Sequence, residues 1–136
     1  MKKRLSIFAV LIIFIGFASC SKSDDTKITG RWQLQSALYP THETITDSVF
    51  YSFDRGIFAL QTLQSGNLYA ESTVGEYSLQ GDSIIMKVAP SYTERARNSI
   101  YYDWKTAERR FALRTLTDKT LVFSVKDTVY TFRKYH

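Results

Sequence analysis

The chain has 136 residues, which is enough for one domain and too few for two. It contains one cysteine and two histidines, which excludes a disulfide-stabilised scaffold and a zinc site built from several Cys or His ligands. Three of its 18 basic residues are Lys2, Lys3 and Arg4, so the remainder has 15 basic against 13 acidic residues, and the pI of 9.4 does not indicate a nucleic-acid partner.

The first element is an export signal. An apolar run from Leu5 to Phe17 follows the basic start, and it is shorter than the about 20 residues that span a bilayer. The segment Phe17-Ala18-Ser19-Cys20 resembles the lipobox of bacterial lipoproteins, in which a signal peptidase cuts before a cysteine that carries a diacylglycerol thioether. The resemblance implies a signal peptide at residues 1–19 and Cys20 as the lipidated first residue, with acyl chains such as palmitate. The alternative is an ordinary secretory signal with an incidental cysteine.

Residues 20–27 are predicted to be a flexible tether, because Ser21 to Asp25 is polar and charged. Its serine and acidic residues also resemble the signal with which Bacteroidota send lipoproteins to the cell surface. We therefore expect the protein at the bacterial outer membrane, held by its lipid anchor and facing the periplasm or the cell surface.

The rest of the chain, residues 28–136, alternates apolar and polar residues with period two between short turns, which predicts consecutive antiparallel strands. In the first strand, Trp32, Leu34, Ser36 and Leu38 are predicted to face inward. Gly75 is expected to form a bulge or bend. Eight strands are predicted: Arg31 to Tyr39, Ser48 to Phe53, Ile57 to Gln64, Leu68 to Gln80, Ser83 to Val88, Arg109 to Leu116, Thr120 to Val125 and Asp127 to Tyr135. Such strands need closure or a second sheet to hide their edges.

One segment, Pro90 to Glu108, lacks this alternation. Ser91 and Glu94 have the spacing of a capping box, and apolar residues then recur at helical spacing as far as Trp104. This predicts one short amphipathic helix between the fifth and sixth strands. Two interpretations stay open, a helix that plugs one end of the fold with Trp104 in the core and a mobile lid over a ligand cavity.

Both ends of the strand region carry family motifs, Gly30-Arg31-Trp32 in the first strand and Tyr130 to Tyr135 in the last. Together with Gly75-Glu76-Tyr77 before Gly81-Asp82-Ser83, they resemble the small lipocalin-like lipoproteins of Bacteroidota, within the lipocalin or calycin group. The resemblance implies an all-β, eight-stranded antiparallel up-and-down barrel that allows a hydrophobic ligand inside. It also implies a basic residue packed on Trp32, which maps to Arg133, although alternation from an inward Phe132 places Arg133 on the opposite face.

Neither histidine accompanies a nucleophile motif, and His42 with Glu43 and Asp47 shows no typical metal spacing, so we expect no catalytic residue, no metal, no cofactor and no enzyme. The first hypothesis is a membrane-anchored protein that binds a small apolar or amphipathic ligand, with Arg133 or Arg114 for an anionic group. The alternative is a structural or accessory subunit that binds an envelope protein or surface glycan through its outer face. The predicted ligand-binding residues are Trp32, Tyr51, Phe53, Phe58, Tyr77, Phe111, Phe123, Phe132 and Arg133.

Overall fold

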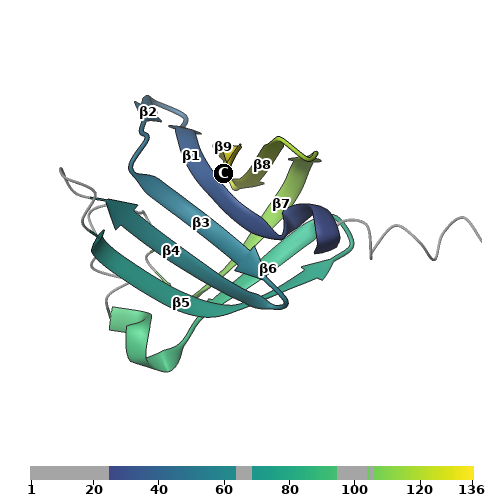
Figure 1. The fold of residues 1–136 in the computed structure, drawn as a ribbon. Coiled ribbons are helices and arrows are strands. Elements are labelled where there is room, and N and C mark those ends of the chain that lie inside the picture. Colours follow the sequence, from purple (N-terminus) through teal and green to yellow (C-terminus); the bar gives the residue numbers. More distant parts are fainter. Residues whose placement is uncertain (1–24, 64–68, 95–103, 105) are drawn as a thin grey trace, which may run out of the picture.

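A closed antiparallel β-barrel forms the body of the molecule in the computed structural model, which describes residues 25–63, 69–94, 104 and 106–136 (Figure 1). The sheet closes because the first strand pairs with both β3 and the last strand. Eight strands make up the barrel, which confirms the predicted architecture: β1 (Gly30–Leu38), β3 (Val49–Asp54), β4 (Ile57–Leu63), β5 (Tyr69–Gln80), β6 (Ser83–Val88), β7 (Glu108–Leu116), β8 (Thr120–Val125) and β9 (Thr128–Tyr135).

A ninth strand, β2 (Glu43–Ile45), was not predicted. Among the described strands it pairs with β1 alone, at Ser36 to Leu38. β3 pairs with the first part of β1, from Gly30 to Gln33. All three of its side chains are exposed, so its sequence carries no apolar alternation that would identify a strand.

The turns divide the barrel into two ends. At the closed end, short turns join β3 to β4, β5 to β6 and β7 to β8; the first is the two-residue hairpin Arg55-Gly56, whose φ angles of 47° and 82° favour glycine at the second position. At the open end lie the last residues of β1, β4 and β6 and the two-residue turn between β8 and β9. The predicted turns at Asp54-Arg55-Gly56 and Lys126-Asp127 are thus confirmed.

The predicted inner face of β1 is right only in its first half. The pairing of β1 with β9 shifts register between Leu34 and Ser36, and such a bulge exchanges the two faces of a strand. As a result Ala37 is buried, whereas Leu38, predicted to face inward, is 50% exposed.

Gly75 does not interrupt β5, contrary to the prediction. Its neighbours pair in regular register with β4 and β6, and the shift between β4 and β5 lies at Thr62 and Leu63 instead. The Phe58 ring lies against Gly75, where an added Cβ would come within 2.7 Å of the ring and would also collide with the Lys87 carbonyl oxygen. Glycine is required here for close packing rather than for a bend.

The helix placement also differs from the prediction. A helical turn precedes the first strand, at residues 25–28, and lies partly within the predicted tether. Between β6 and β7 the described residues show a 3₁₀ turn, Pro90–Tyr92, with Ala89 at its N-cap in place of the predicted capping box. Thr93 and Glu94 after it are helical, and Ala96 and Ile100 lie outside the described residues. No helix in the described ranges is both long and apolar enough to cross a membrane.

Candidate ligand-binding site

Aromatic side chains fill the centre of the barrel. All eight aromatic residues predicted to line the interior are buried, with exposed fractions of 7% or less. Their rings form a continuous cluster, with 4.4 Å between the ring centroids of Phe111 and Phe123, 4.9 Å between those of Phe123 and Phe132, and 4.8 Å between those of Tyr51 and Phe132. Phe53 and Tyr77 form a separate edge-to-face pair at 5.1 Å.

Trp104 extends this cluster from the segment between β6 and β7. It is fully buried, its ring lies 5.8 Å from Phe58 and 6.0 Å from Phe111, and its Nε1 donates a hydrogen bond of 3.2 Å to the Tyr51 hydroxyl. This supports the interpretation in which Trp104 packs in the core. It also shows that the barrel centre accommodates a planar aromatic group with one polar donor.

The basic residue that packs on Trp32 is Lys134 and not Arg133. Lys134 lies directly opposite Trp32 in the β1–β9 register, and its Nζ is 4.6 Å from the ring centroid. Arg133 is exposed on the outer face, where its Nη2 donates to the Gln33 Oε1 at 2.9 Å. The role that the resemblance assigned to Arg133 is therefore wrong by one position, because strand alternation turns Lys134 inward.

Lys134 also accounts for the glycine of the Gly30-Arg31-Trp32 motif. Its Nζ donates to the Thr29 carbonyl oxygen at 2.5 Å, and its side chain crosses the position where a Cβ on Gly30 would lie. Gly30 has φ +130°, a backbone conformation that side chains other than glycine rarely adopt. Burial lowers the pKa of the Lys134 ammonium group below its usual value.

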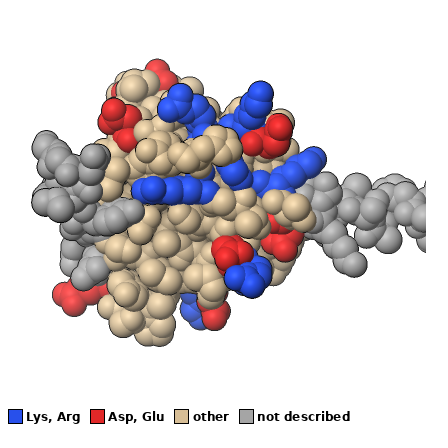
Figure 2. All heavy atoms as spheres, in the orientation of Figure 1, with Lys and Arg blue, Asp and Glu red and all other residues tan. Residues whose placement is uncertain are grey.

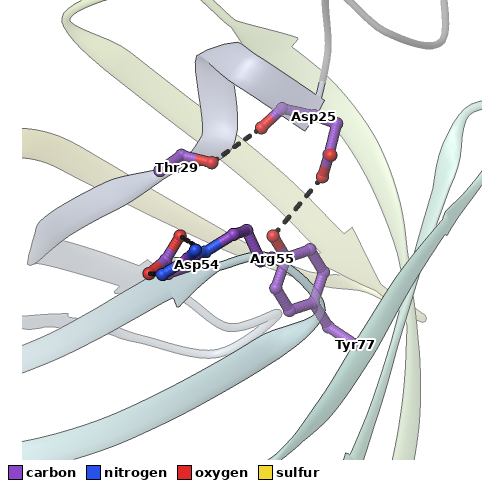
Figure 3. A network of polar contacts seen from close by, with 5 residues as sticks. All are labelled: Asp25, Thr29, Asp54, Arg55 and Tyr77. Carbon is purple, nitrogen blue, oxygen red and sulfur yellow. Dashed lines mark hydrogen bonds and ion pairs between the residues drawn. The ribbon is translucent and has the colours of Figure 1, made fainter.

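The helical turn at residues 25–28 covers the closed end. Ile28 is fully buried, and its carbonyl oxygen accepts a hydrogen bond of 2.8 Å from the Trp32 indole. The Tyr77 hydroxyl donates to the Asp25 carboxylate at 3.4 Å, which ties the start of the described chain to β5 (Figure 3). Burial raises the pKa of Tyr77, and the nearby Asp25 charge raises it further, against a hydrogen bond to the Gly56 backbone that lowers it.

A notch opens the barrel wall at the other end. β7 pairs with β6 from Glu108 onward but with β8 only from Ala112, so the first residues of β7 extend past the end of β8. A depression of about 370 Å³ occupies this place. Its lining is polar and basic on the β7 side and mixed on the β8–β9 side: Thr106, Glu108, Arg109, Arg110, Val125, Lys126, Thr128 and Tyr130. We call this depression the β7–β8 notch.

The notch and its cations were not predicted from the sequence. Arg133 and Arg114 were predicted to bind an anionic group, but Arg114 is exposed and its Nε donates to Ser124 at 2.9 Å on the outer face. Arg109 shares the inner face of β7 with Phe111, and its guanidinium lies 5.1 Å from the Phe111 ring centroid. Arg109 lies two residues before Phe111, and residues two apart in a strand share a face. That spacing could have predicted Arg109 on the inner face.

One polar group inside the barrel has no hydrogen-bond partner among the described residues. The Thr62 side chain is fully buried on the inner face of β4, two residues beyond Leu60, and its hydroxyl is unsatisfied there. Thr73, on the inner face of β5, is also fully buried. The interior is therefore aromatic in its centre and carries hydroxyl groups toward the open end of β4.

Charges elsewhere do not form a single-sign surface on the face shown in Figure 2, where basic and acidic side chains alternate. His42 is exposed, stacks on Tyr39 with 4.7 Å between ring centroids, and bonds to the Thr41 hydroxyl. Within the described ranges no three His, Cys, Asp or Glu side chains are grouped as metal ligands.

Comparison with known proteins places the fold. A family model described as a lipocalin-like domain matches residues 14–135, and no curated protein matches the chain. A crystal structure of a lipocalin-like protein from Bacteroides uniformis ATCC 8492 is similar at 27% identity and a TM-score of 0.73, covering 80% of this chain and 99% of that one. A second, of an uncharacterized protein from Bacteroides eggerthii DSM 20697, is similar at 32% identity and a TM-score of 0.71, covering 79% and 99%.

Proposed function

Because the chain belongs to the lipocalin-like domain family, we propose that it is a lipid-anchored binding protein of the bacterial envelope that holds a small apolar or amphipathic molecule. The observation that carries the proposal is the aromatic interior of the closed barrel, which borders the β7–β8 notch through Tyr130. Small-molecule sites are mostly apolar concavities with a few placed polar groups, and these two regions provide both.

The contacts within the aromatic cluster restrict where such a ligand fits. Rings and Trp104 already occupy the centre, so a ligand either enters at the open end or replaces the Trp104 ring next to Tyr51, Phe58 and Phe111. An eight-stranded barrel is just wide enough for its side chains or one small ligand. The ligand we propose is therefore small and does not fill a large lumen.

The anchor part of the proposal is supported by Cys20 and by the docking of residues 25–28 at the closed end. Asp25 lies five positions after Cys20, and an extended chain of that length spans at most about 18 Å. The contact between Asp25 and Tyr77 thus holds the closed end toward the membrane. The open end with its notch then faces away from the lipid surface.

Native mass spectrometry of residues 21–136, produced in a bacterium of the same group and purified without detergent, tests the binding function. We expect a copurified small molecule as a mass increment that disappears on denaturation. Recovery of the bare chain in every preparation, and no increment after exposure to an extract of host metabolites, would contradict the proposal.

The anchor is tested separately by intact mass measurement of the full-length protein from its host. We expect cleavage before Cys20 and the added mass of a diacylglycerol and acyl chain, both lost in Cys20→Ser. A mature chain that keeps an unmodified Cys20 would show an ordinary secretory signal.

One observation favours the accessory role as a second candidate. Leu38 and Ile45 are 50% and 73% exposed and lie on the same side of the β1–β2 pair, where Ser36 is opposite Ile45. Adjacent exposed apolar side chains are typical of protein-binding surfaces. In the same mass spectrometry experiment, a stable protein partner lost in Ile45→Ser would support this role.

A further inference from the structure

We propose that the β7–β8 notch binds the anionic head of an amphipathic ligand, a carboxylate or a phosphate, while the apolar part of the ligand lies against Tyr130 and Val125. This inference rests on the proposed binding function and specifies the class of ligand.

The notch is a built feature of strand register. Ser83 to Lys87 of β6 pair with Ala112 to Glu108 of β7, whereas β8 ends at Val125 and meets β7 only from Ala112. The next strand begins after a two-residue turn, in which Lys126 has φ 52°. The turn therefore fixes Lys126 on one side of the notch while Arg109 and Arg110 line the other.

The charge of the notch selects anions. Three cationic side chains line it against one carboxylate, Glu108. In the part of the chain that the structure describes, Arg110 and Lys126 form no ion pair and no side-chain hydrogen bond, and both are exposed. Cations grouped in a concave site attract an anion more strongly than single cations on a flat surface do, and Arg in addition binds carboxylate or phosphate with two parallel hydrogen bonds.

The apolar side of the notch accounts for the rest of the ligand. Tyr130 is 3% exposed and its ring meets Phe111 edge to face at 5.9 Å, so one residue of the lining belongs to the interior aromatic cluster. Arg109 also lies over Phe111, which places a cation beside the same ring. A volume of about 370 Å³ is near the lower limit of small-molecule sites, which suits a compact head with a short apolar chain.

The test measures binding of decanoate, decyl phosphate and decanol to residues 21–136 by calorimetry at about pH 7.5 and low salt. We expect both anions, or one of them, to bind about tenfold more tightly than decanol, since hydrogen bonds to a charged head contribute about 1.5–3 kcal/mol and each 1.4 kcal/mol is tenfold. The anion that binds better identifies whether the natural head is a carboxylate or a phosphate. Added salt should weaken anion binding and leave decanol binding unchanged.

The variant Arg110→Gln/Lys126→Gln should lose about tenfold in affinity for the preferred anion and keep its affinity for decanol. The matched control Arg55→Gln/Lys119→Gln removes the same charge from exposed positions at the closed end and should bind as the parent does. Equal affinity for all three probes, or an equal loss of anion affinity in both double variants, would overturn the proposed anion site in the notch. The proposed binding function would remain intact. Absence of binding for all three probes would overturn both.

Discussion

The Lys134 ammonium group lies 4.6 Å from the centre of the Trp32 ring, on the strand that closes the barrel, and donates to the Thr29 carbonyl oxygen. This contact joins the first and last strands at the closed end. It combines a cation–π interaction with a charged hydrogen bond, and burial of the ammonium opposes both, as its lowered pKa indicates.

Lys134→Met should lower the free energy of unfolding by about 1–2 kcal/mol, because it keeps the aliphatic packing on Trp32 and removes the cation and the hydrogen bond. Urea unfolding at neutral pH measures the loss. Lys119→Met, an exposed lysine at the same end, serves as control and should change stability by less than about 0.5 kcal/mol. Equal effects of the two substitutions would show that the Trp32 contact contributes nothing.

Gly30→Ala should destabilise the protein by about 3 kcal/mol, the sum of a disallowed φ and a collision with Lys134. Gly81→Ala is the matched control, since Gly81 has φ +61° but no atom near an added Cβ, and should cost only about 1 kcal/mol. Removing the obstacle in Gly30→Ala/Lys134→Ala should recover part of the loss. A double variant less stable than the sum of its singles would refute the steric explanation.

Trp104→Ala should cost about 3–5 kcal/mol, the range for large buried aromatic residues, and leave a cavity bordered by Tyr51, Phe58 and Phe111. Indole should then bind in that cavity and raise the melting temperature of the variant, as ligands that bind only the folded state do. The parent protein, whose Trp104 fills the place, is the control. A melting temperature that indole leaves unchanged in the variant would mean that the barrel closes around the gap.

The raised pKa of Tyr77 predicts that the stability of the protein falls at alkaline pH. This pKa is raised above 10.0 in the folded state, so between pH 10.0 and the folded pKa the unfolded chain loses a proton that the folded protein keeps, and stability falls as pH rises. Tyr77→Phe lacks this proton, so the stability difference between parent and variant should shrink from about pH 9 to about pH 11. Lys134 titrates in both proteins and cancels. Urea unfolding at the two pH values measures this difference in the free energy of unfolding. A difference that stays constant with pH would contradict a raised pKa of Tyr77.

The tether predicts how the barrel is oriented on a membrane. In the proposed lipoprotein Cys20 carries the lipid, so a cysteine introduced elsewhere is the one free thiol. A fluorescent label can then be placed at Asp118→Cys at the closed end or Lys126→Cys at the open end. In vesicles with quenchers on the lipid head groups, we expect stronger quenching at 118. Stronger quenching at 126 would mean that the open end faces the membrane.

Alternation along the chain was sufficient to predict the strands and the aromatic interior, whereas the closed barrel was implied by the family resemblance. The predicted bounds of β6 and β8 are those observed, because the turns and apolar faces of these strands are local features. The inward positions of Tyr51 and Phe123 followed from period two alone. Local pattern is thus enough where a strand is regular and one of its faces is buried.

Features that depend on pairing between distant strands could not be predicted. The bulge after Leu34 exposes Leu38 because of its register with β9, almost a hundred residues away in the sequence. The same holds for the notch, which exists because β8 stops short of the start of β7. The basic residue on Trp32 is Lys134 and not the predicted Arg133. A family role is therefore better assigned by the face of the strand on which a residue lies than by its residue type.

The pairing of β1 with β9 has a consequence for how the chain is made. Thr128–Tyr135 is the last strand to be synthesised, and without it β1 and β8 would both present open edges. The aromatic cluster would then remain accessible until β9 emerges, and loss of β9 would favour aggregation over a smaller fold. Such late closure suits the export that we propose, in which the chain crosses a membrane unfolded before it folds.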